Sequence, residues 1–152
     1  MTRSLPLTRR SAIGLGLAAA LVPLHARAAA RVVLGFDELY GKVSVLGLEF
    51  SQKVRELDGQ EVRIVGFMAP PLKAEADFFV LGKQPMAICP FCSSDADWPD
   101  DIVVIYLRRK QTFEHTTGRV VVEGVLEHGS WTDPETGFVS LLRLRDADFR
   151  AL

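Results

Sequence analysis

Hydrophobic and polar residues alternate with a period of two from Glu61 to Met68. In this stretch Val62, Ile64 and Met68 fall on one face, and Arg63 and Phe67 fall on the other. A period of two is the pattern of a β-strand with one buried face, and the Pro70-Pro71 pair that follows cannot continue a sheet ladder. The sequence therefore predicts a strand that ends at these prolines.

Further strands are predicted at Phe78–Leu81, Ile102–Leu107, Val120–Glu127 and Phe138–Leu144. The stretch Ile102–Leu107 is apolar throughout and rich in β-branched residues, as expected of a strand covered on both faces in the middle of a sheet. The last two strands are separated by a loop that contains Asp133-Pro134 and Gly137, which favours a hairpin.

The region before Gly59 is the helical part of the chain. Phe50, Val54 and Leu57 are spaced as on one helix face, with Ser51 near the start and Gly59 just past the end. Residues 36–40 fit one further helical turn, and residues 43–48 fit a short strand.

After Gly59 no stretch is long and periodic enough to be a crossover helix, which disfavours a parallel, helix-layered sheet. Interior glycines such as Gly66 and Gly124 suit the strongly bent strands of a small barrel. We expect a mainly β fold: a five-stranded antiparallel barrel of the oligonucleotide/oligosaccharide-binding (OB) type, with one or two short N-terminal helices.

Residues 1–30 differ from the rest of the 152-residue chain. They contain four arginines and no acidic residue, an apolar run from Ser11 to Leu24, and small residues around Ala28. This is the pattern of a cleaved secretory signal, and the adjacent Arg9 and Arg10 indicate the twin-arginine type, with general secretion as the alternative. The apolar run is too short to span a bilayer, so we expect an exported, periplasmic domain of residues 31–152 with no membrane span.

The net charge of the mature domain excludes one class of function. Without the four leader arginines, 14 of the 18 basic residues remain against 19 acidic ones, a charge of about −5. Arg108, Arg109 and Lys110 form only a short basic cluster, and no aromatic residues are spaced for base stacking. Nucleic-acid binding is not expected. Motifs of hydrolytic catalysis are absent as well.

Cys89 and Cys92 are the two cysteines of the chain, and their C-x-x-C spacing allows a redox disulfide, half of a metal site, or a structural staple. Pro90 would place Cys89 at the start of a tight turn, where amide dipoles favour the thiolate. A thioredoxin-like oxidoreductase needs a long helix after the pair, yet Trp98-Pro99 follows within a few residues. Two thiolates can instead hold one zinc or copper ion from one side.

A tetrahedral metal site needs further ligands beyond the two sulfurs. His115 and His128 are the histidines of the mature domain, and the sequence leaves open whether either reaches the cysteine pair. Asp95 and Asp97 lie just downstream of Cys92, within an acidic run that otherwise fits a solvated loop. Trp98 and Trp131 are both expected in loops, packed over the mouth of the barrel or serving as anchors for a partner.

Two segments resemble a family of small exported bacterial proteins of unassigned function. The first runs Leu57-Asp58-Gly59-Gln60-Glu61-Val62-Arg63-Ile64-Val65-Gly66-Phe67-Met68-Ala69-Pro70, and the second runs Gly137-Phe138-Val139-Ser140-Leu141-Leu142-Arg143-Leu144. The resemblance implies the barrel fold. Some members look like accessories of metal-type ABC transport systems, which implies a metal-handling context and a membrane transporter or another periplasmic protein as partner. Cys89-Pro90-Phe91-Cys92 departs from the single cysteine of the commoner family pattern.

From these patterns we expect an exported, non-enzymatic binding or accessory protein that handles a transition metal, zinc or copper, through Cys89 and Cys92, with His115 and His128 as candidate completing ligands. The alternative is a periplasmic thiol-disulfide oxidoreductase that uses the same cysteine pair.

Overall fold

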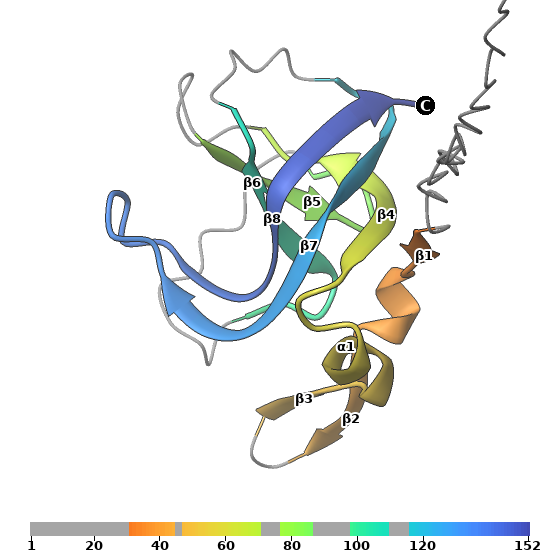
Figure 1. Ribbon diagram of the computed structural model, residues 1–152, viewed down its shortest axis with the longest axis vertical. Helices are drawn as coiled ribbons and strands as arrows, with labels where there is room; N and C mark the ends of the chain where they lie inside the picture. Colours follow the sequence, from red (N-terminus) through yellow and green to blue (C-terminus); the bar gives the residue numbers. More distant parts are fainter. Residues whose placement is uncertain (1–30, 45–46, 71–76, 87–97, 110–115) are drawn as a thin grey trace, which may run out of the picture.

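The computed structural model describes residues 31–44, 47–70, 77–86, 98–109 and 116–152, and the protein is mainly β (Figure 1). Six strands form one sheet: β1 (Val32–Val33), β4 (Glu61–Met68), β5 (Phe78–Gly82), β6 (Ile102–Leu107), β7 (Arg119–Thr132) and β8 (Val139–Ala151). A separate two-stranded sheet consists of β2 (Tyr40–Ser44) and β3 (Gly47–Phe50). The helical elements are the 3-10 turn η1 (Phe36–Glu38) and the short helix α1 (Gln52–Glu56).

The strand pairings of the large sheet return to their starting point. The order is β1-β4-β5-β6-β8-β7, and β7 also pairs with β4, so that β4, β5, β6, β8 and β7 form a circuit. Within it, β6 and β8 are parallel, and the other four pairs are antiparallel. The prediction of an antiparallel sheet throughout is therefore wrong. A circuit with an odd number of strands cannot alternate in direction at every step, so at least one pair must be parallel.

β4 has the alternation that its sequence predicts. Val62, Ile64 and Met68 are buried, while Arg63 and Phe67 are half-buried. Over most of its length β4 pairs with β7, and at its end it pairs with β5 through Phe67 and Met68. The strand therefore passes from one neighbour to the other within eight residues.

Two glycines allow the backbone to come close at the bends. A Cβ added at Gly66 would lie 2.6 Å from the carbonyl oxygen of Gly82, and one added at Gly124 would lie 2.8 Å from that of Arg145. Contacts this short do not occur for real side chains, so these positions accept glycine because of close backbone approach. The sequence predicts bent strands at Gly66 and Gly124, and the structure shows a close backbone approach at both positions.

β6 has the bounds that the sequence predicts, and its residues from Ile102 to Tyr106 are buried. It lies between β5 and β8, where both faces are covered. The core around it is formed by apolar residues of every strand of the circuit, and the largest fully buried side chains are Phe79, Phe138, Leu34, Leu39, Ile64, Leu81, Ile102, Ile105, Leu126, Leu142, Leu144 and Val54.

The N-terminal elements differ in part from the prediction. η1 and α1 lie where helical turns are expected, and the Ser51 side chain caps α1 by accepting a hydrogen bond from the Val54 amide at 3.1 Å. Residues 43–48 do not form one strand. Val43 lies in β2 and pairs with Leu48 of the antiparallel strand β3, so this range contains a change of chain direction. Gly47, the first residue of β3, has a positive φ of 110°. Figure 1 places this hairpin and α1 together beyond one end of the large sheet.

β7 and β8 form the predicted hairpin, but both are longer than their sequence patterns indicate. Register shifts interrupt the pairing of these strands, and Asp146 and Gly129 adopt positive φ values of 48° and 103° near them. Such irregularities break the period of two, which explains the shorter prediction.

β1, which the sequence pattern does not reveal, pairs in parallel with β4 through only two residues. No helix within the described ranges has the length and apolar character needed to cross a membrane.

Candidate functional site

The connection between β5 and β6 carries the cysteine pair. Cys89 and Cys92, together with Asp95 and Asp97, lie outside the described residues, but both ends of the connection are described. The Lys83 amide donates a hydrogen bond to the Asp101 carbonyl at 2.9 Å, next to the Gly82–Ile102 pair that ends the β5–β6 ladder. The cysteines therefore lie on a segment whose two ends are joined at the end of two paired strands.

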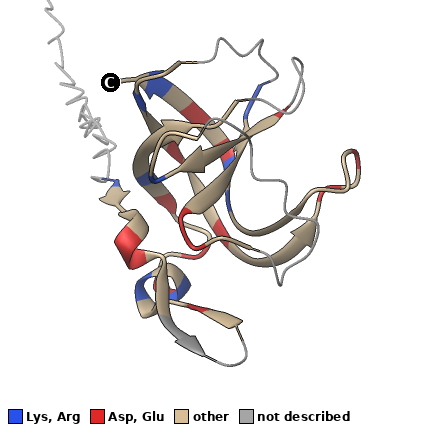
Figure 2. Ribbon diagram, turned by 180° about the vertical axis from the view of Figure 1, so that it is seen from behind, with Lys and Arg blue, Asp and Glu red and all other residues tan. Residues whose placement is uncertain are grey.

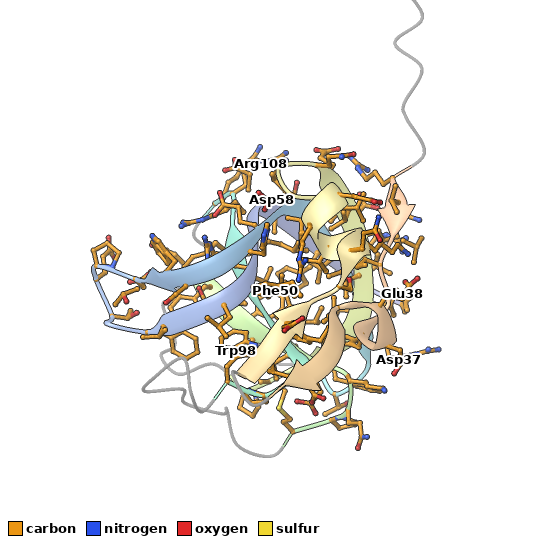
Figure 3. The ribbon with its side chains drawn as sticks, turned by 90° about the horizontal axis from the view of Figure 1, so that it is seen from below. Asp37, Glu38, Phe50, Asp58, Trp98 and Arg108 are labelled. Atoms are coloured by element: carbon orange, nitrogen blue, oxygen red, sulfur yellow. The ribbon has the colours of Figure 1, made fainter. Side chains whose placement is uncertain are left out.

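Trp98 fixes the C-terminal part of this connection. Its side chain is only 5% exposed, and its indole nitrogen donates a hydrogen bond to the Tyr40 hydroxyl at 2.7 Å. Tyr40 in turn stacks on Phe50 with ring centroids 5.5 Å apart. Trp98 lies outside the strands, as predicted, and it packs against the β2–β3 hairpin (Figure 3).

His128, one of the predicted metal ligands, lies on β7 beside the same hairpin. Its ring is edge-on to Phe50 with centroids 5.0 Å apart, and its side chain is 27% exposed. The Asp58 carboxylate accepts from the His128 backbone amide at 3.1 Å and lies 2.8 Å from Nδ1. A carboxylate beside Nδ1 favours a proton on that nitrogen and leaves Nε2 as the ring nitrogen with a lone pair.

The contacts of the described residues connect Trp98 to His128 through Tyr40 and Phe50. His115 lies outside the described residues, as do both cysteines, so the predicted set of four ligands stays a prediction. Within the part of the chain that the structure describes, no three His, Cys, Asp or Glu residues are grouped closely enough to hold a metal ion.

Sequence reasoning missed Asp58 as a partner of His128. The two residues are 70 positions apart, and Asp58 stands in a Leu-Asp-Gly turn after α1 that reads as an ordinary helix end. The missing link is tertiary. The Gly59 amide donates to the Leu126 carbonyl at 2.8 Å, which holds the turn against β7 and brings Asp58 to His128.

A second cluster, of arginines and aromatic rings, lies on β6, β7 and β8. Arg143, although only 7% exposed, pairs with Glu127 at 2.8 Å and donates to the Gly129 carbonyl at 2.9 Å. The Arg145 guanidinium also pairs with Glu127, and it lies 4.0 Å from the centroid of the Trp131 ring and 4.7 Å from that of Tyr106.

Two arginines of this cluster, Arg143 and Arg145, share one carboxylate, that of Glu127. Burial raises the pKa of Glu127, but hydrogen bonds from Arg143 and Arg145 lower this pKa by more, so that the net direction is downward. Burial, followed by the charge of Asp133, raises the pKa of the Tyr106 hydroxyl. Trp131 lies in β7 and not in a loop as predicted, because the β7–β8 ladder continues through the Trp131–Ser140 pair. The contacts of the cluster connect β6, β7 and β8.

Around the edge of the sheet, acidic and basic residues are interspersed. The basic helix α1 lies beside the acidic turn η1, with Lys53 2.7 Å from Glu38 (Figure 2). Arg108, from the predicted basic cluster, pairs with Asp148 at 3.1 Å. Lys110 of that cluster lies outside the described residues.

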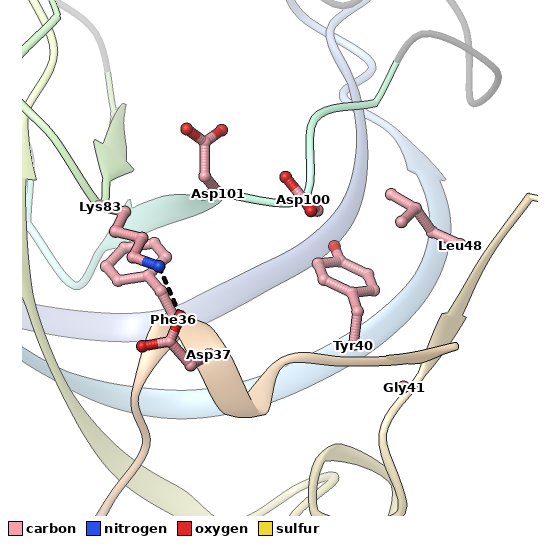
Figure 4. Close-up of a pocket in the computed structure, with 8 residues that line it drawn as sticks. All are labelled: Phe36, Asp37, Tyr40, Gly41, Leu48, Lys83, Asp100 and Asp101. Atoms are coloured by element: carbon pink, nitrogen blue, oxygen red, sulfur yellow. Dashed lines mark hydrogen bonds and ion pairs between the residues drawn. The ribbon is translucent and has the colours of Figure 1, made fainter. Parts of the chain in front are cut away.

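A pocket of about 200 Å³ opens beside the start of β6 (Figure 4). Phe36 and Asp37 of η1, together with Tyr40, form one side of it. Asp100 and Asp101, from the turn before β6, face them. The acidic run that the sequence predicts as a solvated loop extends from Asp95 to Asp101. Of its acidic residues, Asp100 and Asp101 are described, and they line a concave surface.

The sequence comparisons find no match, whereas the comparison of structures finds a similar fold. No known protein-family model matches the sequence, and no curated protein matches it significantly. The mixed sheet with its closed circuit of pairings is nevertheless similar to a solved structure, the crystal structure of a DUF3299 family protein from Pseudomonas aeruginosa PAO1. The TM-score is 0.54 and the sequence identity 14%, over 81% of this chain and 97% of that one. At this identity the similarity establishes a common fold only.

Proposed function

We propose that the chain is an exported, non-enzymatic binding or accessory protein that takes a transition metal, zinc or copper(I), through Cys89 and Cys92. The observation that carries the proposal is the placement of the cysteine pair on a segment closed by the Lys83–Asp101 hydrogen bond. The buried Trp98 anchors the same segment. Binding residues are commonly found on loops that a rigid scaffold holds in place.

The scaffold is proposed to be an OB-type barrel. Numbering the circuit strands along the chain, the first pairs with the second and fourth, and the fifth lies between the third and the fourth. The parallel pair joins the third and fifth strands, β6 and β8. This order agrees with a five-stranded Greek-key barrel. Barrels of the OB type bind their ligands on one strand face and on nearby loops.

His128 is the proposed completing ligand for which the described residues supply support. Histidines that bind metals through one ring nitrogen usually donate the other N–H to a carboxylate, which fixes the tautomer and the ring orientation. Asp58 provides such a carboxylate, 2.8 Å from Nδ1 of His128. Contacts through Tyr40 and Phe50 tie this ring to Trp98, six positions after Cys92. His115 remains a second candidate ligand.

The oxidoreductase alternative has less support. β6 begins at Ile102, and Trp98 and Pro99 are not helical, so five residues separate Cys92 from Trp98. Five residues make less than two helical turns, whereas a thioredoxin-like active site uses a long helix after its cysteine pair.

The proposed partner is a membrane transporter or another periplasmic protein. The proposed localisation signal is the pair Arg9 and Arg10, which would direct export through the twin-arginine route.

The test is a titration of the reduced mature protein with Zn²⁺ and, separately, with Cu⁺ under anaerobic conditions. We expect one ion per chain and a lower affinity as the pH falls, because thiolate ligands must lose their protons. Trp98 provides an optical signal in a Trp131→Phe background, since Trp131 is the other tryptophan of the mature domain. Calorimetry on the unmodified protein measures the stoichiometry.

Variants separate the roles of the ligands. Cys89→Ser is expected to abolish stoichiometric binding. Asp58→Asn is expected to weaken it by about 10- to 100-fold, the range found when orienting groups of a metal site are removed, and His128→Ala, which removes a proposed ligand, is expected to weaken it at least as much. His115→Ala tests the second candidate ligand in the same way. Binding that survives Cys89→Ser would contradict the proposal, and catalytic oxidation of a reduced substrate protein without metal binding would favour the oxidoreductase.

A further inference from the structure

The pocket beside β6 has a negative charge that its own residues do not neutralise. Its lining consists of Phe36, Asp37, Tyr40, Gly41, Leu48, Lys83, Asp100 and Asp101. Three carboxylates thus face one ammonium group, a formal charge of −2 at neutral pH. The volume of about 200 Å³ is several times that of one water molecule, which takes about 30 Å³.

Lys83 is already engaged inside the pocket. Its ammonium group lies 2.5 Å from the Asp37 carboxylate, and both side chains are well exposed, at 44% and 83% (Figure 4). Among the described residues, neither Asp100 nor Asp101 takes part in an ion pair. The hydrogen bond and charge of Asp37 raise the pKa of Lys83, and Asp100 and Asp101 add to this effect. The field in the pocket therefore favours cations.

The side chains that lie between the carboxylates of the pocket are those that suit an organic cation. No three acidic, histidine or cysteine residues in the described ranges lie close enough to coordinate one ion. The walls between the carboxylates are the aromatic rings of Phe36 and Tyr40 and the aliphatic side chain of Leu48. Aromatic faces attract weakly hydrated cations, and the planar guanidinium combines stacking with paired hydrogen bonds to carboxylates.

We propose that this pocket binds a guanidinium group, stacked against the aromatic wall and bonded to Asp100 and Asp101. The group comes either from a small alkylguanidine or from an arginine side chain of a partner protein. The proposal does not depend on metal binding by Cys89 and Cys92, because every residue in it lies outside the cysteine pair. The two proposals can therefore fail separately.

The first test measures binding of N-butylguanidinium to the mature protein by NMR chemical-shift titration at low salt. N-butylurea, a neutral compound of the same shape, is the ligand control. We expect at least tenfold tighter binding of the cation, and a loss of that difference in high salt because charge attraction is screened. Equal binding of the two compounds, or no shift at pocket residues with either, would overturn the proposal.

Variants assign the effect to the pocket. Asp100→Asn with Asp101→Asn is expected to weaken N-butylguanidinium binding by about tenfold. Glu135→Gln with Asp146→Asn, an equal change of charge at two exposed positions outside the pocket, is expected to leave it unchanged. Lys83→Met is expected to strengthen binding severalfold, because it removes the cation that competes for the carboxylates and releases Asp37. Weaker binding in Lys83→Met would contradict this account of the field.

A capped Gly-Arg-Gly peptide and its citrulline counterpart distinguish the two sources of the group. Tighter binding of the arginine peptide than of N-butylguanidinium would identify a partner chain as the source. Tighter binding of N-butylguanidinium would identify a small ligand, since the pocket would then reject the peptide backbone. Binding of the citrulline peptide as strong as that of the arginine peptide would overturn the proposal, because citrulline keeps the shape and lacks the charge.

Discussion

Gly66→Ala tests how closely the strands approach where β4 changes partner. The new Cβ would lie 2.6 Å from the Gly82 carbonyl oxygen, 2.9 Å from Leu81 Cγ and 3.0 Å from Phe36 Cε2. Carbon atoms pack best at about 3.5–4.0 Å, so the contact with Leu81 is roughly 0.6 Å too short. The nearest atom belongs to the backbone of a neighbouring strand and cannot move aside without disturbing the β4–β5 pairing.

Overpacking of this kind costs about 1–3 kcal/mol, and the lower entropy of the unfolded alanine chain returns about 0.4–1 kcal/mol. From the middle of these ranges we expect a net loss of about 1.3 kcal/mol in the free energy of unfolding. With a urea m value of about 2 kcal/mol/M, the midpoint falls by about 0.6 to 0.7 M at constant m. Gly118→Ala is the control, because its nearest neighbour would be 3.7 Å away, an ordinary contact. If the two variants unfolded at the same urea concentration, the close approach at Gly66 would be refuted.

The other predictions use different observables. Ile105→Asp places an unpaired carboxylate in the core, where Ile105 is 0% exposed. It is expected to lower the free energy of unfolding in urea by about 3 kcal/mol or more. Val33→Asp, at a 57% exposed position, is the control and is expected to keep a free energy of unfolding near that of the wild type. Glu127→Gln is expected to reduce the loss of stability that the protein shows in acid. The folded pKa of Glu127 is lowered, so the stabilisation by this carboxylate is complete above about pH 5 and is lost as the pH falls through the folded pKa. If the urea midpoint fell equally steeply with pH in both proteins, the ion pairs of Glu127 would not contribute to stability. Replacing Arg9 and Arg10 by lysine is expected to retain the precursor in the cytoplasm in fractionation, and normal export would remove the twin-arginine assignment.

Local patterns were sufficient to predict most strands. β6 has the predicted bounds, and β4 and β5 differ from the prediction by one or two residues, because their periodicity and the breakers around them are local signals. The direction of pairing is not local. Closure of an odd-numbered circuit requires at least one parallel pair, and no single strand pattern records that the pair is β6 with β8.

The candidate sites show the same division. The cysteine pair and the histidines are visible as residue types, whereas the contact of Asp58 with His128 depends on the backbone bond between Gly59 and Leu126. The pocket beside β6 joins residues 36–48, from η1 and the β2–β3 hairpin, with Lys83 after β5 and with the turn before β6, three parts of the chain that are far apart in the sequence. Each part contributes one to five ordinary residues, so no sequence motif indicates the pocket.

The state of the two sulfurs in the exported protein tests the central claim most directly. Native mass spectrometry of the mature protein, isolated from the periplasm without reductant or chelator, separates the possibilities by mass. We predict one zinc or copper ion per chain, bound with loss of the thiol protons, and its absence in Cys89→Ser. A metal-free protein lighter by two hydrogen atoms, with Cys89 bonded to Cys92, would contradict the account.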